Sequence, residues 1–284
     1  MTQSSFLNRK KVAFIHTVGV AYFFLATFGV VYSCIFIAYP VVYTEPKDIQ
    51  WRSICLIYVF INIIGNYFLG ILNKSNYTPG IQVTDPPTSW KFCSVCDRYC
   101  PPRTHHCEIC KVCILKRDHH CFFFCQCVGL RNQRYFIPYT LYVALGSLHA
   151  MYIITAYLNM KYVTFKFSIY AILSYTLPGI VYNWVYTYGN ITLTTASCIV
   201  LLYLLFSAGF GSLFLFLAQC FLLVRGQTPY EYHKNIHTFN HGVVTNLTQV
   251  FGRFWFLYFL IPLPSNIMSK QGILPCGTSN YKDV

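Results

Sequence analysis

Near its N-terminal end the chain contains, at residues 12–44, the stretch VAFIHTVGVAYFFLATFGVVYSCIFIAYPVVYT, which has no Asp, Glu, Lys or Arg. The stretches 53–73, 135–160 and 167–224 also lack these charged residues. A helix crosses the hydrocarbon core of a bilayer with about 20 apolar residues. The four stretches therefore predict an α-helical, multi-pass membrane protein with about four membrane helices. The first stretch is too long for a cleaved signal peptide, so we expect it to be a retained anchor.

The composition excludes most soluble classes of protein. Only 10% of the 284 residues are charged, whereas soluble domains average about 25%. The net charge of +13 could indicate a nucleic-acid partner, but its distribution favours membrane topology. Seventeen of the 21 Lys and Arg residues lie before residue 12, within 74–134 or after 224. The positive-inside rule places these three regions together in the cytosol.

The uncharged and polar stretches divide the chain into four parts. Residues 1–72 form a tail and membrane helices one and two, and residues 73–134 form a cytosolic domain. Membrane helices three and four lie within 135–224, and residues 225–284 form a cytosolic tail with an interfacial segment at 254–261. The 58 residues of 167–224 would make one helix about 87 Å long, so it must break near Pro178 or Gly189. Residues 167–187 are then either an outer hairpin or re-entrant segment, or a fifth span that would place the tail on the opposite side from the N-terminus.

Nine of the 14 cysteines lie between residues 93 and 127. In the reducing cytosol such a cluster indicates metal binding or catalysis instead of disulfides. Two interleaved Cys-x2-Cys pairs with flanking histidines suit tetrahedral Zn²⁺. We therefore expect two structural zinc sites, which would fold a segment that has almost no hydrophobic core.

One short motif in this region has the residue types of a nucleophilic site. Asp118, His119 and Cys121 place a carboxylate, an imidazole and a thiol within four positions. An imidazole beside a thiol favours the reactive thiolate, and a carboxylate orients the imidazole. The motif lies between expected zinc ligands and a few residues before a membrane helix, which strengthens the interpretation.

This arrangement resembles the DHHC-type protein S-acyltransferases, or palmitoyltransferases, whose cysteine-rich zinc-finger domain lies between the second and third of four membrane helices. The resemblance implies that Cys121 is the acylated nucleophile, that His119 is its base and that Asp118 orients His119. It implies one zinc ion on Cys93, Cys96, His106 and Cys113, and a second on Cys107, Cys110, His120 and Cys127.

Further positions match motifs of the family outside the zinc domain. The sequence Thr-Pro-Tyr-Glu at 228–231 resembles the family's TTxE motif. The resemblance implies structural support of the site by Asn132, Phe136, Thr228, Glu231 and Asn246. A family position on helix three that closes the acyl cavity when bulky corresponds by count to Gly146. A small residue there implies a deeper cavity for chains of sixteen carbons or more.

The chain departs from the usual family pattern after Cys121. Where the family has Pro-Trp-x-Asn-Asn-Cys, residues 122–127 are Phe-Phe-Phe-Cys-Gln-Cys. Such departures, and the Arg-Gly-Gln-Thr stretch at 225–228, resemble the small, divergent type-twenty-four members. They also motivate an alternative, a catalytically weak or inactive zinc-containing membrane scaffold.

The resemblance implies a transferase that moves an acyl group from fatty acyl-CoA, such as palmitoyl-CoA, to cysteine thiols of substrate proteins. Its expected partners are the lipid bilayer, acyl-CoA, and cytosolic or membrane proteins with accessible cysteines. No nucleic-acid partner is expected, because the cluster is tethered between membrane spans and lacks the C₂H₂ helix pattern. We expect an endomembrane location, in the Golgi or endoplasmic reticulum, in preference to the plasma membrane.

Overall fold

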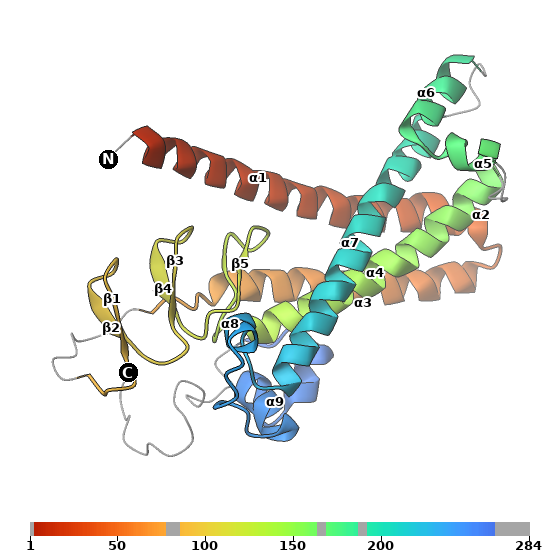
Figure 1. Ribbon diagram of the computed structural model, residues 1–284. Coiled ribbons are helices and arrows are strands. Elements are labelled where there is room, and N and C mark those ends of the chain that lie inside the picture. Colours follow the sequence, from red (N-terminus) through yellow and green to blue (C-terminus); the bar gives the residue numbers. More distant parts are fainter. Residues whose placement is uncertain (1–2, 78–85, 164–168, 187–191, 265–284) are drawn as a thin grey trace. The chain divides into compact units, whose positions relative to one another are not determined.

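The computed structural model of the chain describes residues 3–77, 86–163, 169–186 and 192–264. Four of its helices are long and apolar enough to cross a membrane, namely Arg9–Val42, Pro46–Leu72, Gln133–Lys161 and Leu193–Val224 (Figure 1). The first consists of α1 (Gln3–Tyr32), the π-helical η1 (Ser33–Ala38) and α2 (Tyr39–Val42). The others are α3 (Pro46–Leu72), α4 (Gln133–Lys161) and α7 (Leu193–Val224). The predicted membrane protein with four membrane helices is confirmed.

The uncharged stretch 167–224 breaks as its length requires. Its first part forms α5 (Ile169–Ser174) and α6 (Leu177–Tyr186), which have 6 and 10 residues. Pro178 lies in the first turn of α6, where a missing backbone N–H costs no helical hydrogen bond. Neither helix approaches the length of a span. Within the described part of 167–187 the hairpin alternative therefore fits better than the fifth span.

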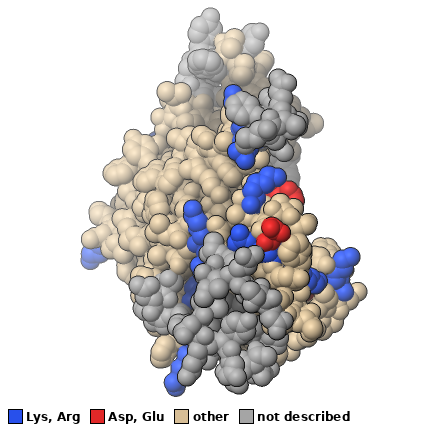
Figure 2. Space-filling model, turned by 90° about the vertical axis from the view of Figure 1, so that its left-hand side faces the viewer, with Lys and Arg blue, Asp and Glu red and all other residues tan. Residues whose placement is uncertain are grey.

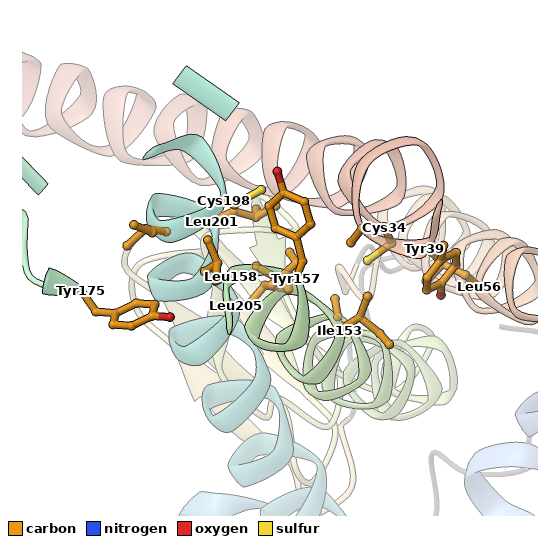
Figure 3. Packing of buried hydrophobic residues seen from close by; sticks show 14 of the residues in the cluster. Cys34, Tyr39, Leu56, Ile153, Tyr157, Leu158, Tyr175, Cys198, Leu201 and Leu205 are labelled. Atoms are coloured by element: carbon orange, nitrogen blue, oxygen red, sulfur yellow. The ribbon is translucent and has the colours of Figure 1, made fainter. Parts of the chain in front are cut away.

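The chain forms two compact units that interleave in sequence, and each long helix contributes residues to both. The second unit contains residues 22–61 and 141–214. Its core is a cluster of buried side chains from η1, α2, α3, α4 and α7, with Tyr175 from the segment that follows α5 (Figure 3). Cys34, Tyr39, Ile153 and Leu158 are fully buried there. Cys34 and Cys198 are free thiols in this core, where a thiol packs as a small apolar group.

The first unit contains residues 1–21, 62–140 and 215–284, and therefore the cysteine-rich region. That region folds as three antiparallel hairpins (Figure 1). They are formed by β1 (Lys91–Cys93) with β2 (Arg98–Cys100), β3 (His105–Cys107) with β4 (Val112–Ile114), and β5 (His120–Cys121) with β6 (Gln126–Cys127). Its two buried clusters consist largely of cysteines, with few apolar side chains such as Ile114 and Leu115. The hairpins therefore lack a hydrophobic core large enough to hold them together.

The end of α7, which belongs to the first unit, is closed by local hydrogen bonds. Gly226 has φ 64°, a left-handed conformation that glycine adopts without strain. The N–H of Gly226 donates to the carbonyl of Leu223, and that of Gln227 to Leu222, which is the Schellman pattern of a helix C-terminus. The short helix α8 (Pro229–His233) follows directly.

After α8 the first unit is completed by α9 (Val243–Phe251) and the 3₁₀ turn η2 (Trp255–Phe259). Phe251 and Tyr258 pack against Tyr135 and Leu223, whereas Trp255 is exposed. The turn is too short to span a bilayer, and the interfacial position of 254–261 stays a prediction. Residues 265–284 of the predicted tail, and residues 78–85 of the predicted cytosolic domain, lie outside the described residues.

Figure 2 shows one face of the molecule, on which Lys and Arg side chains are spread over the described surface and acidic side chains are few. If the four candidate helices among the described residues all cross the bilayer, the segments before Arg9 and after Val224 lie on the same side of it. The distribution of Lys and Arg predicts that this side is the cytosol.

We therefore expect tags at both chain ends to be removed when protease is added to sealed microsomes. A luminal marker should survive until detergent opens the vesicles. Digestion of the N-terminal tag alone would show a fifth crossing and would contradict this topology.

Candidate active site

The strand register of the hairpins brings each predicted set of metal ligands together. His106 lies directly opposite Cys113, and His120 directly opposite Cys127. Facing residues in an antiparallel pair have neighbouring side chains. Each such pair meets the Cys-x2-Cys turn of the preceding hairpin, at residues 93–96 and 107–110 respectively. One cluster therefore joins the first two hairpins, and the other joins the last two.

The donor set and its spacing suit zinc. Each cluster contains three thiols and one imidazole, with the ligand atoms within 4.8 Å of one another. In the second cluster His120 Nδ1 lies 3.7 Å from Cys107 Sγ, 3.2 Å from Cys110 Sγ and 3.7 Å from Cys127 Sγ. Ligand atoms around a tetrahedral zinc are about 3.5–3.8 Å apart. Both clusters, among the described residues, could hold a metal ion of this kind.

The thiols of the second cluster compete for a proton. A hydrogen bond from Cys127 lowers the pKa of Cys110 to about 5, and the same interaction raises the pKa of Cys127. Their sulfurs lie 3.8 Å apart. Metal binding requires thiolates and releases their protons, so a divalent cation would relieve this competition.

The outer nitrogen of His120 contacts a residue that the sequence analysis did not single out. His120 Nε2 lies 3.0 Å from His16 Nε2 of α1, and the two rings are stacked with centroids 5.3 Å apart. A metal-bound histidine usually donates its other N–H to an acceptor that fixes the ring. His16 can supply that acceptor. A histidine inside the uncharged stretch 12–44 was the sequence signal for it.

Cys121 lies on the hairpin that supplies His120 and Cys127 to the second cluster. Its side chain is buried, and the turn at residues 122–125 follows it directly. Cys125 closes this turn with φ 54° and is exposed. Cys121 therefore lies on a short hairpin that begins with His120 and ends with Cys127, and both of these residues belong to the second possible metal site.

The residues that depart from the family pattern hold this hairpin against α3 and α4. Phe124 is 1% exposed and packs edge-on to Tyr67 and Phe136, with ring centroids 5.7 and 5.5 Å away. Gly70 makes room for this ring, because a Cβ there would clash with it. Gln126 Nε2 donates to the carbonyls of Gly70 and Ile71 at the end of α3, at 2.8 and 3.0 Å.

Asp118 and His119 lie beside Cys121 in the predicted arrangement. His119 Nδ1 donates to Asp118 Oδ1 over 2.7 Å, and the Asp118 side chain is 4% exposed. Phe136 contacts the His119 ring edge-on at 5.1 Å. Burial lowers the pKa of His119, but Asp118 and Cys121 outweigh it through hydrogen bonding and charge and raise this pKa to about 9. The imidazole therefore holds its proton at neutral pH.

Two glutamines beside Asp118 were missed by the sequence analysis. Gln219 Nε2 donates to Asp118 Oδ2 over 3.0 Å, and Gln133 Nε2 donates to Gln219 Oε1 over 3.0 Å. Gln219 was detectable as an amide within the long uncharged stretch 167–224, where a polar side chain is costly unless it has partners.

Asn132 lies at the start of α4 with its side chain fully buried. Its Oδ1 accepts hydrogen bonds from Gly129 N and Ser75 Oγ, at 2.8 and 3.1 Å. Its Nδ2 donates to the carbonyl of Cys127 over 3.0 Å. One amide thereby joins the chain after α3, the third hairpin and the first turn of α4.

Thr228 and Glu231 form a capping box at the start of α8. Thr228 Oγ1 accepts from Glu231 N over 3.3 Å, and Glu231 Oε2 accepts from Thr228 N over 2.8 Å. Arg103 donates to both Glu231 oxygens, at 2.8 and 2.7 Å, and also to the carbonyl of Gly226. This buried bidentate ion pair connects α8 to the cysteine-rich region. The sequence analysis did not assign Arg103 a role.

Asn246 of α9 supports the same turn from the other side. Its Nδ2 donates to the carbonyl of Val224, the last residue of α7, over 2.9 Å. Its Oδ1 accepts from His241 N over 3.2 Å.

Gly146 is buried on α4 in the second unit, and its role in setting the depth of an acyl cavity stays a prediction.

Four helices of membrane-spanning length, two Cys₃His clusters and an Asp–His pair near a thiol define the class, a multi-pass membrane protein with a cysteine-rich domain that could bind metal. The family described as DHHC palmitoyltransferase matches residues 87–236 of the chain. This match covers more than half of the 284 residues. The chain belongs to the DHHC palmitoyltransferase family.

Named relatives agree with this assignment. The chain is 32% identical over 247 residues to probable palmitoyltransferase ZDHHC24 of Danio rerio, covering 81% of this chain and 79% of that protein. It is 30% identical over 277 residues to palmitoyltransferase ZDHHC22 of the same species, covering 90% and 93%. It is 28% identical over 208 residues to palmitoyltransferase ZDHHC22 of Rattus norvegicus, covering 71% and 73%. The expected family and the resemblance to type-twenty-four members are confirmed.

Metal analysis tests the clusters and the role of His16. We expect about two zinc ions per folded chain, following the two four-ligand sets. His16→Leu removes the acceptor for His120, so a chelator should take one of the two ions about 10–100-fold more readily. Thr17→Ala, an exposed change on the same turn, is the matched control. Equal chelation rates for His16→Leu and the wild type would contradict this role.

Proposed function

We propose that this palmitoyltransferase moves a fatty acyl group from acyl-CoA to protein thiols through an acyl-Cys121 intermediate. The observation that supports it best is the hydrogen bond of the partly exposed His119 to the buried Asp118, beside a buried thiol on a hairpin that carries residues of one possible metal site. A hairpin fixed in this way presents its thiol in one orientation, which is what alignment with a thioester requires.

His119 favours the reactive form of the nucleophile. With its pKa at about 9, the imidazole is positively charged at neutral pH and stabilises an adjacent thiolate. Asp118 stabilises the imidazolium and keeps Nδ1–H directed at its own oxygen. The second ring nitrogen of His119, Nε2, is then free to interact with the Cys121 thiol.

The reaction has two steps that both exchange one thioester for another. The Cys121 thiolate attacks the acyl-CoA carbonyl, a C–S bond to Cys121 forms, and the bond to coenzyme A breaks. The departing coenzyme A thiolate takes the His119 proton and leaves as the thiol. In the second step the now neutral His119 takes the proton of the substrate protein's thiol, and the resulting thiolate attacks acyl-Cys121. A C–S bond to the substrate forms as the bond to Cys121 breaks, which restores the Cys121 thiolate beside the His119 imidazolium. Because bond types are conserved, the enzyme mainly supplies the thiolate and the alignment.

The clusters and the polar contacts around the site have structural roles in this proposal. Two zinc ions, one on each set of ligands, would supply folding energy that the small apolar core cannot. Five residues would keep the third hairpin, α4, the end of α7 and α8 in their relative positions: Asn132, Phe136, Thr228, Glu231 and Asn246. The contacts described above for each of them support that role.

The alternative of an inactive membrane scaffold rests on the residues that replace the family pattern after Cys121. Phe124 and Gln126 nevertheless anchor the hairpin by aromatic packing and by two hydrogen bonds to α3. The reactive loop is therefore built with different residues, which favours the enzyme over the scaffold.

The proposed site faces the cytosol, where acyl-CoA and substrate proteins are available, and we assign the protein to Golgi or endoplasmic-reticulum membranes. The product chain would strengthen membrane attachment of a substrate protein by about 0.8 kcal/mol per buried CH₂. The basic excess of the chain supports the cytosolic orientation.

Labelling with radioactive palmitoyl-CoA tests the nucleophile. We expect one hydroxylamine-sensitive acyl group per chain in the wild type and none in Cys121→Ser, because only Cys121 combines an adjacent His119 with absence from both clusters. Cys125→Ser is the matched control, since Cys125 is also unliganded and lies on the same hairpin.

Label that persists in Cys121→Ser and disappears in Cys125→Ser would reassign the nucleophile. A folded wild type with both metals that accepts no acyl group from any acyl-CoA would support the scaffold instead.

The charge on His119 predicts a pH-dependent effect of this residue on the thiol. In a Cys125→Ser background, alkylation of Cys121 by iodoacetamide at pH 7 should be faster than in the same protein with His119→Ala, because the imidazolium favours a neighbouring thiolate. This difference should disappear as the pH rises through about 9, where the imidazole loses its proton. Equal alkylation rates for the two proteins at pH 7 would exclude this role of His119.

A further inference from the structure

The catalytic carboxylate of the proposed mechanism has a second partner on its far side. Asp118 Oδ1 accepts from His119, and Asp118 Oδ2 accepts from Gln219 over 3.0 Å. Gln219 is 4% exposed and lies on α7. The two carboxylate oxygens thus have separate donors on opposite sides, which fixes the plane of the group as well as its position.

Chemistry sets the direction of the Gln219 amide. An ionised carboxylate only accepts hydrogen bonds, so the Gln219 atom that faces Asp118 must be the NH₂ group. The Gln219 oxygen then faces Gln133, whose Nε2 donates to it over 3.0 Å. Gln133 is 5% exposed and is the first residue of α4. Its N–H prevents the Gln219 amide from rotating its oxygen toward Asp118.

The hydrogen bonds therefore run in one direction, from Gln133 through Gln219 to Asp118. We propose that Gln219 is a positioning residue for acyl transfer, oriented by Gln133, and that it holds Asp118 where it orients His119. This inference rests on the proposed roles of Cys121, His119 and Asp118, and it adds two membrane-helix residues to them.

A simpler role for the glutamines is to join α4 to α7, as amides often do between membrane helices. In that role, the effect of a Gln219 substitution on the acylation rate would be the same with and without the Asp118 carboxylate. A positioning role acts only through Asp118, so the effect of the Gln219 substitution disappears when the carboxylate is removed. The two roles therefore differ in the coupling between Gln219 and Asp118, which a double-mutant cycle measures.

The size of the expected effect follows from what is lost. Removing the orienting carboxylate of a catalytic triad costs about 10⁴-fold in rate. Substitution of Gln219 removes only one of the two hydrogen bonds that hold the Asp118 carboxylate. We expect a loss of about 10–100-fold in the rate of Cys121 acylation, with the KM for palmitoyl-CoA unchanged.

The test compares acylation rates in purified full-length protein. Gln219→Met has a similar volume and no donor, and Gln219→His keeps an N–H donor. We expect the slow rate for Gln219→Met with zinc content unchanged, and a rate within a few-fold of wild type for Gln219→His. Leu217→Ala, on the exposed face of the same helix, is the control. In an Asp118→Asn background, Gln219→Met should cause no further loss.

Two results would overturn the inference: a normal rate in Gln219→Met, or an equal fold-loss with and without the Asp118 carboxylate. If Gln219→Met loses its zinc, Gln133→Met replaces it, because this change leaves Gln219 in place and removes only its orienting contact. That variant should lower the rate by about 2–10-fold, and only while Asp118 is present.

The labelling experiment separates this inference from the proposed function. If the wild type is acylated and Cys121→Ser is not, the proposed function stands even when Gln219 substitutions have no effect on the rate. If Cys121 of the wild type is never labelled, the proposed function itself is contradicted.

Discussion

The cross-strand pair of His120 and Cys127 is the contact on which the rest of the site depends. These residues face each other at the base of the third hairpin, and both belong to the second metal cluster. Cys121 follows His120 directly, so whatever fixes the pair also fixes the thiol. The hairpins bury mainly cysteines and have almost no apolar core. Metal–ligand bonds, which contribute directly to folding, are the physical means of holding such a segment in one conformation.

A second constraint comes from buried polar side chains beside the membrane helices. Asp118, Asn132 and Glu231 are almost completely removed from solvent, and each has hydrogen-bond partners from another part of the first unit. A buried polar group without partners is strongly destabilising, so each of these side chains specifies its neighbours as well as its own position. The Arg103–Glu231 pair shows this well, since either residue alone would be an uncompensated buried charge.

The loop after Cys121 is fastened by residues that differ from the usual family sequence. Aromatic packing of Phe124 and the two hydrogen bonds of Gln126 fasten the loop to α3, and Gly70 leaves space for the aromatic ring. The contact of His16 with His120 adds a restraint from α1. In this chain the backbone of the loop is therefore fixed by contacts with α1, α3 and α4.

The sequence by itself determined the elements whose signals are local. Uncharged stretches of bilayer length predicted four membrane helices, and Cys-x2-Cys spacing with flanking histidines predicted metal sites, because span length and ligand number are properties of short segments. The nucleophilic motif at 118–121 was visible for the same reason. Only the tertiary structure decided which distant side chains meet. His16 on His120, Gln219 on Asp118 and Arg103 on Glu231 are separated by 104, 101 and 128 positions in the chain. Such pairs leave no periodic or spacing signal, since each forms only when helices and hairpins pack and a buried polar atom must find its partner.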